Sequence, residues 1–162
     1  MAFDFNPLRP VVVSGSPLPL RARCLARLES LAHRLHPRPP VNPQHVLGRQ
    51  GEELAYWFLR GQGYTIVARN YRFPRRRGEL DLIGWEGGVL VFVEVKSRFR
   101  RDDYSALRAV DFDKRRQLVR LARAYRRRKG YMGRFRFDVV AVYQPHGSHP
   151  ELELHRDAFW AE

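Results

Sequence analysis

The chain has a single cysteine, Cys24, and no long run of apolar residues. One cysteine cannot form an internal disulfide, which fits a reducing compartment. The longest aliphatic and aromatic runs, residues 89–93 and 139–143, fall far short of the roughly 20 residues that span a bilayer. Residues 1–10 also lack the basic and then apolar order of a secretory signal. We therefore expect a cytoplasmic protein.

Two frequent catalytic signatures are missing as well. The sequence has no glycine-rich loop of the G-x-x-x-x-G-K type, and no serine or cysteine in a nucleophile setting. Its six histidines come without a cysteine cluster, so a zinc site is not expected. With 162 residues, 44% of them apolar, the chain suffices for one domain with a real core and excludes two large domains.

What the sequence has in excess is positive charge. Thirty Lys and Arg side chains against 17 Asp and Glu give a formal net charge of +13, and residues 96–136 alone carry 16 basic and 4 acidic side chains. Nearly all of the basic residues are Arg, whose planar fork suits phosphate oxygens. A polyanion, above all a nucleic acid, is the expected partner, and a membrane is not. A basic face that is merely solvated is the alternative.

The first 46 residues contain eight prolines and little alternation of apolar and polar residues. Within them, apolar residues recur at helical spacing from about residue 20 to 35 with Arg on the other side, which predicts one amphipathic basic helix. We expect a Pro- and Arg-rich arm over residues 1–46 and an α/β domain over residues 47–162. The helix of the arm could pack on the domain, lie along nucleic acid or meet a partner.

From residue 47 onward the pattern alternates between helix and strand. An apolar stripe predicts a helix over residues 47–61, and Asp111 as N-cap predicts a basic helix that ends at Gly130. Residues 73–78 (FPRRRG) predict a loop, and Glu86-Gly87-Gly88 has hairpin composition. Strands are predicted over residues 64–71, 79–85, 89–96 and 135–143, with a last short one at 152–155.

The sharpest chemical signal lies in the hairpin of residues 79–96. Side chains alternate between the two faces of a strand, so Glu94 and Lys96 share a face while the valines between and before them point into an apolar layer. A turn of two or four residues would pair Asp81 with Phe92 and bring its carboxylate to the Glu94 face. A turn of three residues would place it on the wrong face.

Carboxylates on two adjacent strands, with an ammonium close by, are what metal-assisted hydrolysis of a phosphodiester requires. Mg²⁺ keeps most of its waters and takes one or two carboxylates, a backbone carbonyl such as that of Val95, and a phosphate oxygen. The metal makes a bound water acidic enough to attack, and Lys96 would position that water and offset the growing negative charge. The alternative is an ion pair of Lys96 with Glu94 or Asp81 that only holds the sheet together.

A set of motifs closely resembles the bacterial YraN family over about residues 46–160: G-R-Q-G-E-E-L-A (48–55), N-Y-R (70–72), R-G-E-L-D-L-I (77–83), V-F-V-E-V-K-S-R (91–98), Lys114 and R-F-D-V-V-A-V (136–142). That family is itself assigned to the PD-(D/E)XK nuclease superfamily, near archaeal Holliday junction resolvases. The resemblance implies a restriction-endonuclease-like αβββαβ core with a central mixed sheet. It also implies Asp81 and Glu94 as ligands of Mg²⁺ or Mn²⁺, Lys96 as the catalytic lysine, and Glu52 on the first helix as a further catalytic and metal-binding group.

Two departures from the family pattern stand out. Leu80 occupies the position of the proline for which the motif is named, which carries little chemical weight because proline supplies no ligand. The arm has no counterpart in the pattern, so its role cannot be inherited. For Glu52 the alternative is an ordinary first-turn Glu favoured by the helix dipole. Glu79 is interpreted as a supporting or capping group, and Asp138 as a partner in a structural hydrogen bond.

Contacts with the nucleic-acid backbone are expected from the 73–78 loop, the end of the second hairpin strand and the first turns of the basic helix, where helix N-termini also favour phosphate. These predicted contacts are Arg75, Arg76, Arg77, Arg98, Lys114, Arg115 and Gln117. The sequence therefore predicts a Mg²⁺- or Mn²⁺-dependent endonuclease that acts on DNA, with branched DNA as the candidate substrate. A junction resolvase would need a homodimer. The rival hypotheses are a non-catalytic nucleic-acid-binding protein on the same fold, and an adaptor that docks through its arm.

Overall fold

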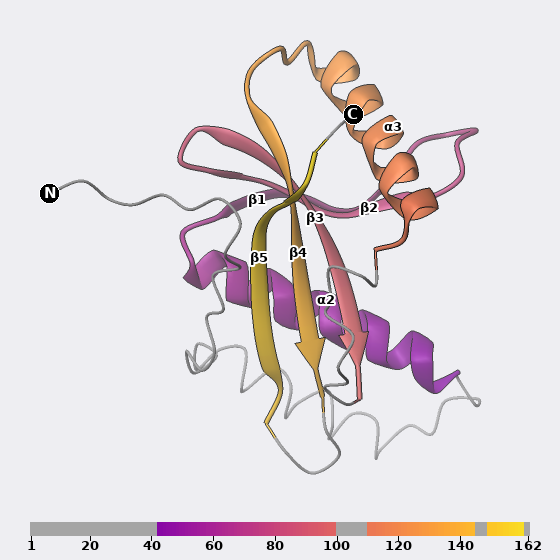
Figure 1. Cartoon of the computed structure of the whole chain (residues 1–162), viewed down its shortest axis with the longest axis vertical. Helices are drawn as coiled ribbons and strands as arrows, with labels where there is room; N and C mark the ends of the chain where they lie inside the picture. The colour runs from indigo at the N-terminus through magenta and orange to yellow at the C-terminus, as the bar shows by residue number, and fades with distance from the viewer. Residues whose placement is uncertain (1–41, 100–109, 145–148, 161–162) are drawn as a thin grey trace, which may run out of the picture.

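The structure is a computed structural model that describes residues 42–99, 110–144 and 149–160; the helix expected near residues 20–35 lies outside them. In chain order the elements are α2 (Pro43–Gly61), β1 (Thr65–Arg72), β2 (Glu79–Glu86), β3 (Val89–Arg98), α3 (Phe112–Lys129), β4 (Phe135–Tyr143) and β5 (Glu151–Phe159). The order αβββαβ, followed by one more strand, confirms the expected α/β class (Figure 1).

The strands form one five-stranded mixed sheet in the order β1-β2-β3-β4-β5. The first three strands are an antiparallel meander, β3 and β4 are parallel, and β5 returns antiparallel to β4. A parallel pair cannot be closed by a tight turn, so the chain must cross over between β3 and β4. Helix α3 is that crossover, and it therefore begins near the carboxyl end of β3 (Figure 1).

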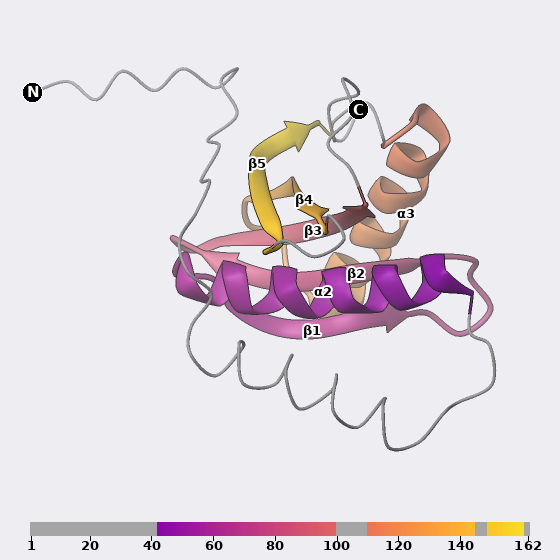
Figure 2. The same ribbon diagram turned by 90° about the horizontal axis from the view of Figure 1, so that it is seen from below.

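The two helices cover opposite faces of the sheet (Figure 2). Along β3 the side chains alternate as expected: Val91 and Val93 join the core under α2, while Leu90 and Phe92 join the core under α3. Glu94 continues the Phe92 side and therefore lies on the face that α3 covers.

Helix α2 begins four residues earlier than predicted. Asn42 is its N-cap and accepts a hydrogen bond from the Gln44 N–H at 3.0 Å, and Pro43 is the first helical residue. A proline is compatible with this position because the N–H it lacks would have no partner inside the helix. Residues 43–46, predicted to belong to the arm, are thus part of α2. No helix in the described ranges is long and apolar enough to cross a membrane.

Short-range sequence signals determine both ends of α3, whereas pairing with β4 determines the length of β5. Asp111 caps α3 by accepting from the Lys114 N–H at 2.8 Å, and Gly130 ends the helix in the left-handed conformation at φ 62°. Both ends confirm the prediction. Strand β5 is longer than the predicted 152–155 because it pairs with β4 over nearly its whole length, across a bulge where Asp157 has φ 51°.

Asp138, on β4, is fully buried and has a structural role. Its carboxylate accepts from the Tyr64 hydroxyl at 2.8 Å, from Arg136 at 2.9 and 3.0 Å, and from the Asp157 N–H at 2.9 Å. Arg136 also binds Glu86 at 3.1 Å. Burial and the neighbouring Asp138 charge raise the pKa of Tyr64, which keeps its hydroxyl a donor. The network ties β1, β2, β4 and β5 together and confirms the structural interpretation of Asp138.

Candidate active site

The β2–β3 turn sets the register of the two predicted acidic residues. Glu86 pairs with Val89, and the two-residue turn between them is Gly87-Gly88, with φ 56° and 77°. Two consecutive positive φ values belong to a tight hairpin turn that glycine adopts without strain. The turn has the predicted length but lies one residue later than Glu86-Gly87, so the register moves by two positions.

This shift changes the partner of Asp81 and leaves its face unchanged. Leu82 pairs with Val93, and the next step of the same register brings Asp81 beside Glu94. The expected pairing of Asp81 with Phe92 is therefore wrong. Because positions two apart point to the same side of a strand, the two carboxylates still meet on one face, and they are closer than predicted.

Asp81 is almost completely buried, at 7% exposure, and its Oδ2 accepts a hydrogen bond from the Val95 N–H at 2.9 Å. Burial and the charge of Glu94 raise the pKa of Asp81, the Val95 N–H and Lys114 lower it, and Glu52 raises it further, so the result is about 7. Burial makes the largest contribution to this shift, and the charge of Glu94 adds to it. Such a carboxyl is a candidate for a functional group.

Glu94 is the centre of the site. It is 3% exposed, and its Oε1 binds two ammonium groups, Lys96 Nζ at 2.9 Å and Lys114 Nζ at 3.0 Å. Its other oxygen, Oε2, is buried and has no hydrogen-bond partner among the described residues. A buried carboxylate oxygen without a partner is costly, and a cation would satisfy it.

Lys114 lies in this site rather than on a surface that faces solvent. It is in the first turn of α3, whose backbone is capped by Asp111, and its ammonium is turned towards β3. Burial lowers the pKa of Lys114, but Glu94, Asp81 and Glu79 raise it by more, so the group is held as a cation. Lys114, which was predicted to contact phosphate, thus contacts Glu94 in this structure.

The rarity of lysine was only a weak signal for Lys114 in the sequence. The chain has only three lysines among its 30 basic residues, and two of them, Lys96 and Lys114, meet at Glu94. Lysine is a compact point charge on a flexible stem, whereas arginine is a broad fork. The third lysine, Lys129, lies at the other end of the same helix, so residue type alone did not single out Lys114 as part of the site.

Glu52 approaches the site from the other face of the sheet. It is half-buried in the middle of α2, so the first-turn alternative is wrong because α2 begins at Pro43. Helix and strand are very close here: a Cβ at Gly51 would lie 1.7 Å from Ser97 Oγ. The charge of Glu52 acts on Asp81, but its effect on the pKa of Asp81 is smaller than that of Glu94.

The remaining acidic residue of the hairpin, Glu79, has a partner of its own. Its Oε2 accepts from the Arg72 Nε at 2.7 Å, across the β1–β2 pair. Glu79 also acts on Lys114 electrostatically. It therefore supports the site from its edge, as interpreted from the sequence.

Asp81 and Glu94 are the side chains that could hold a hard divalent cation such as Mg²⁺ or Mn²⁺. In residues 42–99, 110–144 and 149–160 no three His, Cys, Asp or Glu side chains are grouped so that they could hold a metal ion together. Magnesium does not need such a cage, since one or two carboxylates with waters and substrate oxygens complete its shell. Asp81 and Glu94 supply that pair, and both the partnerless Oε2 and the raised pKa of Asp81 would be relieved by positive charge.

The predicted nucleic-acid contacts differ in how available they are. Arg75, Arg76 and Arg77 are exposed in the loop between β1 and β2. Gln117 packs against this loop, because a Cβ at Gly78 would lie 2.6 Å from its Cδ. The loop is therefore held beside the first half of α3, and its arginines and those of the helix lie on neighbouring surfaces.

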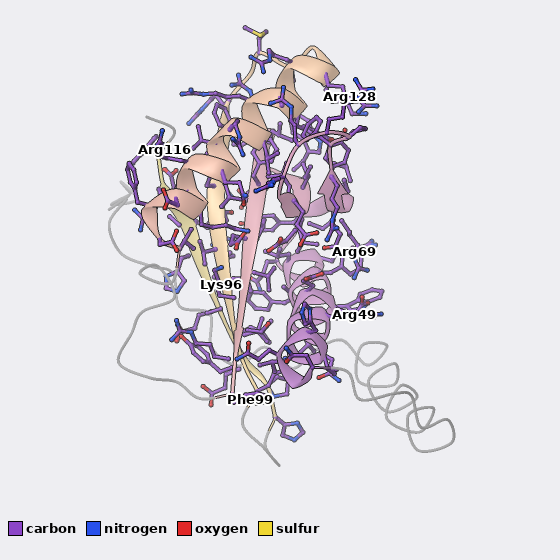
Figure 3. The ribbon with its side chains drawn as sticks, turned by 90° about the vertical axis from the view of Figure 1, so that its right-hand side faces the viewer. Arg49, Arg69, Lys96, Phe99, Arg116 and Arg128 are labelled. Carbon is purple, nitrogen blue, oxygen red and sulfur yellow. The ribbon has the colours of Figure 1, made fainter. Side chains whose placement is uncertain are left out.

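Arg115 and Arg98 are more constrained. Arg115 donates to the Val110 carbonyl at 2.8 Å and its guanidinium lies over the Phe159 ring, 5.6 Å from the centroid. Arg98 is half-buried at the end of β3. The exposed arginines of α3 are better placed for a polyanion, and Figure 3 shows Arg116 and Arg128 near the two ends of the helix, with Lys96 below its first turns. These exposed residues are Arg116, Arg120, Arg123, Arg127 and Arg128.

Fold and site define an α/β protein in which a carboxylate pair and two lysines share one face of a mixed sheet, beneath a basic crossover helix. Residues 51–142 match the model of UPF0102, described as an uncharacterised protein family, and the chain belongs to this family. A UPF0102 protein of Koribacter versatilis (strain Ellin345) is 51% identical over 121 residues, which cover 74% of this chain and 84% of the relative.

Two other relatives support the same family assignment. A UPF0102 protein of Chlorobium chlorochromatii (strain CaD3) is 43% identical over 129 residues, 76% of this chain and 98% of the relative. One of Rhodococcus jostii (strain RHA1) is 47% identical over 115 residues, 70% of this chain and 96% of the relative. The family-level resemblance is therefore confirmed. The family description names no activity, so function has to be inferred from the site.

Proposed function

We propose that the protein is a metal-dependent endonuclease of the PD-(D/E)XK type that hydrolyses phosphodiester bonds in DNA. The observation that carries the proposal is the meeting of Asp81, Glu94 and Lys96 on one face of β2 and β3, with Lys96 Nζ 2.9 Å from Glu94 Oε1. A metal ligand pair with an adjacent ammonium is the minimal equipment for attack by water on a phosphodiester.

Asp81 and Glu94 would hold Mg²⁺ or Mn²⁺, with the Val95 carbonyl as the backbone ligand. Glu52, whose charge acts on Asp81 from α2, would be a further metal-binding group, directly or through a metal-bound water. When bound, the metal supplies a Lewis acid and a water with a lowered pKa. The hydrogen bond from the Val95 N–H fixes the orientation of the Asp81 carboxylate before any metal arrives.

Lys96 is the side chain of the protein that acts at the phosphorus atom. Its side chain is 28% exposed, so its ammonium reaches both Glu94 and the side from which a phosphate can approach. There it orients the attacking water and offsets the charge that grows on the phosphate oxygens as phosphorus becomes five-coordinate. The exposed arginines of α3 and of the 73–78 loop bind the phosphate backbone of the DNA on either side of the cleaved bond. These contacts give affinity with little sequence preference.

The test is cleavage of branched and linear DNA by purified protein with Mn²⁺ or Mg²⁺, in parallel with Asp81→Asn and Lys96→Met. We expect either substitution to lower the cleavage rate by about 100-fold or more, in the range found for removal of one group that stabilises the transition state. Asp113→Asn is the matched control, because Asp113 is exposed in the first turn of α3. Cleavage that persists in Asp81→Asn would mean that another residue or a contaminant is responsible.

One observation favours a non-catalytic nucleic-acid-binding protein instead: both lysines form ion pairs with Glu94, as expected if these charges only stabilise the sheet. That protein would bind DNA in a salt-sensitive way, without cleavage, and would be indifferent to metal and to Lys96→Met. The adaptor hypothesis depends on residues 1–41 of the arm, which lie outside the described residues, and deletion of these residues would test it directly while it spares the Asn42 cap of α2.

A further inference from the structure

The ammonium of Lys114 stands where the acidic groups of the site converge. It lies 3.0 Å from Glu94 Oε1, and its charge is felt by Asp81, so that it serves both members of the carboxylate pair. Glu79 is a third carboxylate near enough to act on it. Three acidic side chains thus face one amine that comes from a different element, α3.

We propose that Lys114 is a built-in counterion that occupies the cation position of the Asp81–Glu94 pair in the metal-free protein and is displaced from it when a divalent metal binds. This inference rests on the proposed function, because it assumes that Asp81 and Glu94 are the metal ligands. It assigns Lys114 a role distinct from that of Lys96. Lys114 holds the acidic pair together before metal binding and becomes available to the substrate afterwards.

Charge balance requires one of the two amines to move. Two carboxylates and two ammonium groups leave the central site neutral, so a divalent cation would add two positive charges next to both lysines. Like charges a few ångströms apart repel strongly where water is largely excluded. Both lysines bind the same oxygen, Glu94 Oε1. A metal bound to Glu94 would therefore weaken the ion pairs that Glu94 forms with the two lysines.

Lys114 is the amine that can leave. Lys96 is anchored on β3 itself, two residues from Glu94, and its backbone cannot move away from that ligand. Lys114 is joined to the site only through its side chain, and its backbone N–H is already held by Asp111. Its side chain is 25% exposed, so rotation about its own bonds brings the ammonium towards the surface of α3 that faces the 73–78 loop.

Displacement would connect metal binding with substrate binding. Once released from Glu94, the Lys114 ammonium lies at the N-terminal end of α3, where the helix dipole also favours phosphate. The predicted phosphate contact of Lys114 would then form only in the metal-bound state. Metal binding would thereby exchange one interaction inside the protein for one with the substrate.

The experiment is a Mn²⁺ titration of chelator-treated protein without DNA, followed by calorimetry or by the electron paramagnetic resonance signal of free Mn²⁺. We expect Lys114→Gln and Lys114→Met to bind Mn²⁺ at least about tenfold more tightly than the wild type, because the metal no longer competes with a resident cation. Lys114→Arg retains the charge and should bind close to wild-type affinity. Lys129→Gln, which removes one exposed charge at the far end of α3, should also leave the affinity within about twofold.

Thermal unfolding of each variant shows whether it is folded, and the two Lys114 substitutions differ enough in polarity that one folded variant is sufficient. Unchanged or weaker Mn²⁺ binding by a folded Lys114→Gln or Lys114→Met overturns the inference and leaves the proposed function intact. Equal Mn²⁺ binding by the wild type and Glu94→Gln overturns both, because the metal would then bind elsewhere. A second readout is cleavage: tighter metal binding with a lower rate of DNA hydrolysis is the expected combination.

Discussion

The carboxyl of Asp81 makes a prediction that needs neither DNA nor a nuclease assay. Its pKa is raised from 3.8 to about 7, first by burial and then by Glu94. In the unfolded chain the group returns to its ordinary value. Between these two values the folded protein binds more protons than the unfolded protein, so the free energy of unfolding falls as the pH rises through this window.

The size of the effect follows from the same shift. Each pH unit inside the window costs about 1.4 kcal/mol, so the Asp81–Glu94 pair should lower the stability of the metal-free protein by about 3 kcal/mol between about pH 5 and pH 7. Asp81→Asn removes the charge and retains an oxygen that can accept from the Val95 N–H. This variant should lose none of that stability over the same range.

Urea denaturation, followed by tryptophan fluorescence in a chelating buffer at several pH values, measures the difference. Contributions from groups that do not interact with Asp81 cancel in this comparison, and Asp113→Asn should run parallel to the wild type because Asp113 is exposed. Excess Mn²⁺ should restore the stability of the wild type at pH 7 and leave Asp81→Asn unaffected. Parallel pH profiles for the wild type and Asp81→Asn would show that the buried Asp81 carboxyl does not cause the fall in stability with pH.

Three further outcomes are expected. Asp138→Ala should lower the free energy of unfolding by about 3–5 kcal/mol in urea denaturation, because it leaves the Arg136 guanidinium without its buried partner; a change near zero would contradict the structural role of Asp138. Gly51→Ala should cost about 1–3 kcal/mol, since its Cβ would collide with Ser97, whereas Gly48→Ala, with open space around it, should be neutral or stabilising by up to about 1 kcal/mol. DNA affinity, measured by fluorescence anisotropy, should fall roughly tenfold or more between low and moderate salt, and a flat profile would exclude the basic α3 surface as the binding face.

The fold was predictable because its signals are local. Alternation along residues 89–96, the Asp111 cap and the Gly130 stop each depend on a few neighbouring residues, and each prediction agrees with the structure to within a residue or two. The start of α2 was misplaced because Pro43 was taken as a sign of the arm. A proline breaks a helix in its interior but not at its first position.

The residues of the site could be predicted from the sequence, but the strand register that pairs them could not. That Asp81 and Glu94 share a face follows from the period of a strand, but which residue lies opposite Asp81 depends on which glycines form the turn. The position of Lys114 required the crossover to be placed in space. Nothing local states that the first turn of α3 lies over Glu94, because that contact joins residues 20 positions apart in different layers.

The Gly87-Gly88 turn contacts neither carboxylate, and yet it decides whether they can cooperate. If one residue were inserted here and the turn kept its length of two residues, β2 would shift by one position against β3, so that Leu82 would lie opposite Glu94 and Asp81 would point towards α2. Such an insertion would abolish the ligand pair while every residue of the site remained in the sequence. The spacing of this hairpin is therefore as much a part of the chemistry as the side chains that it aligns.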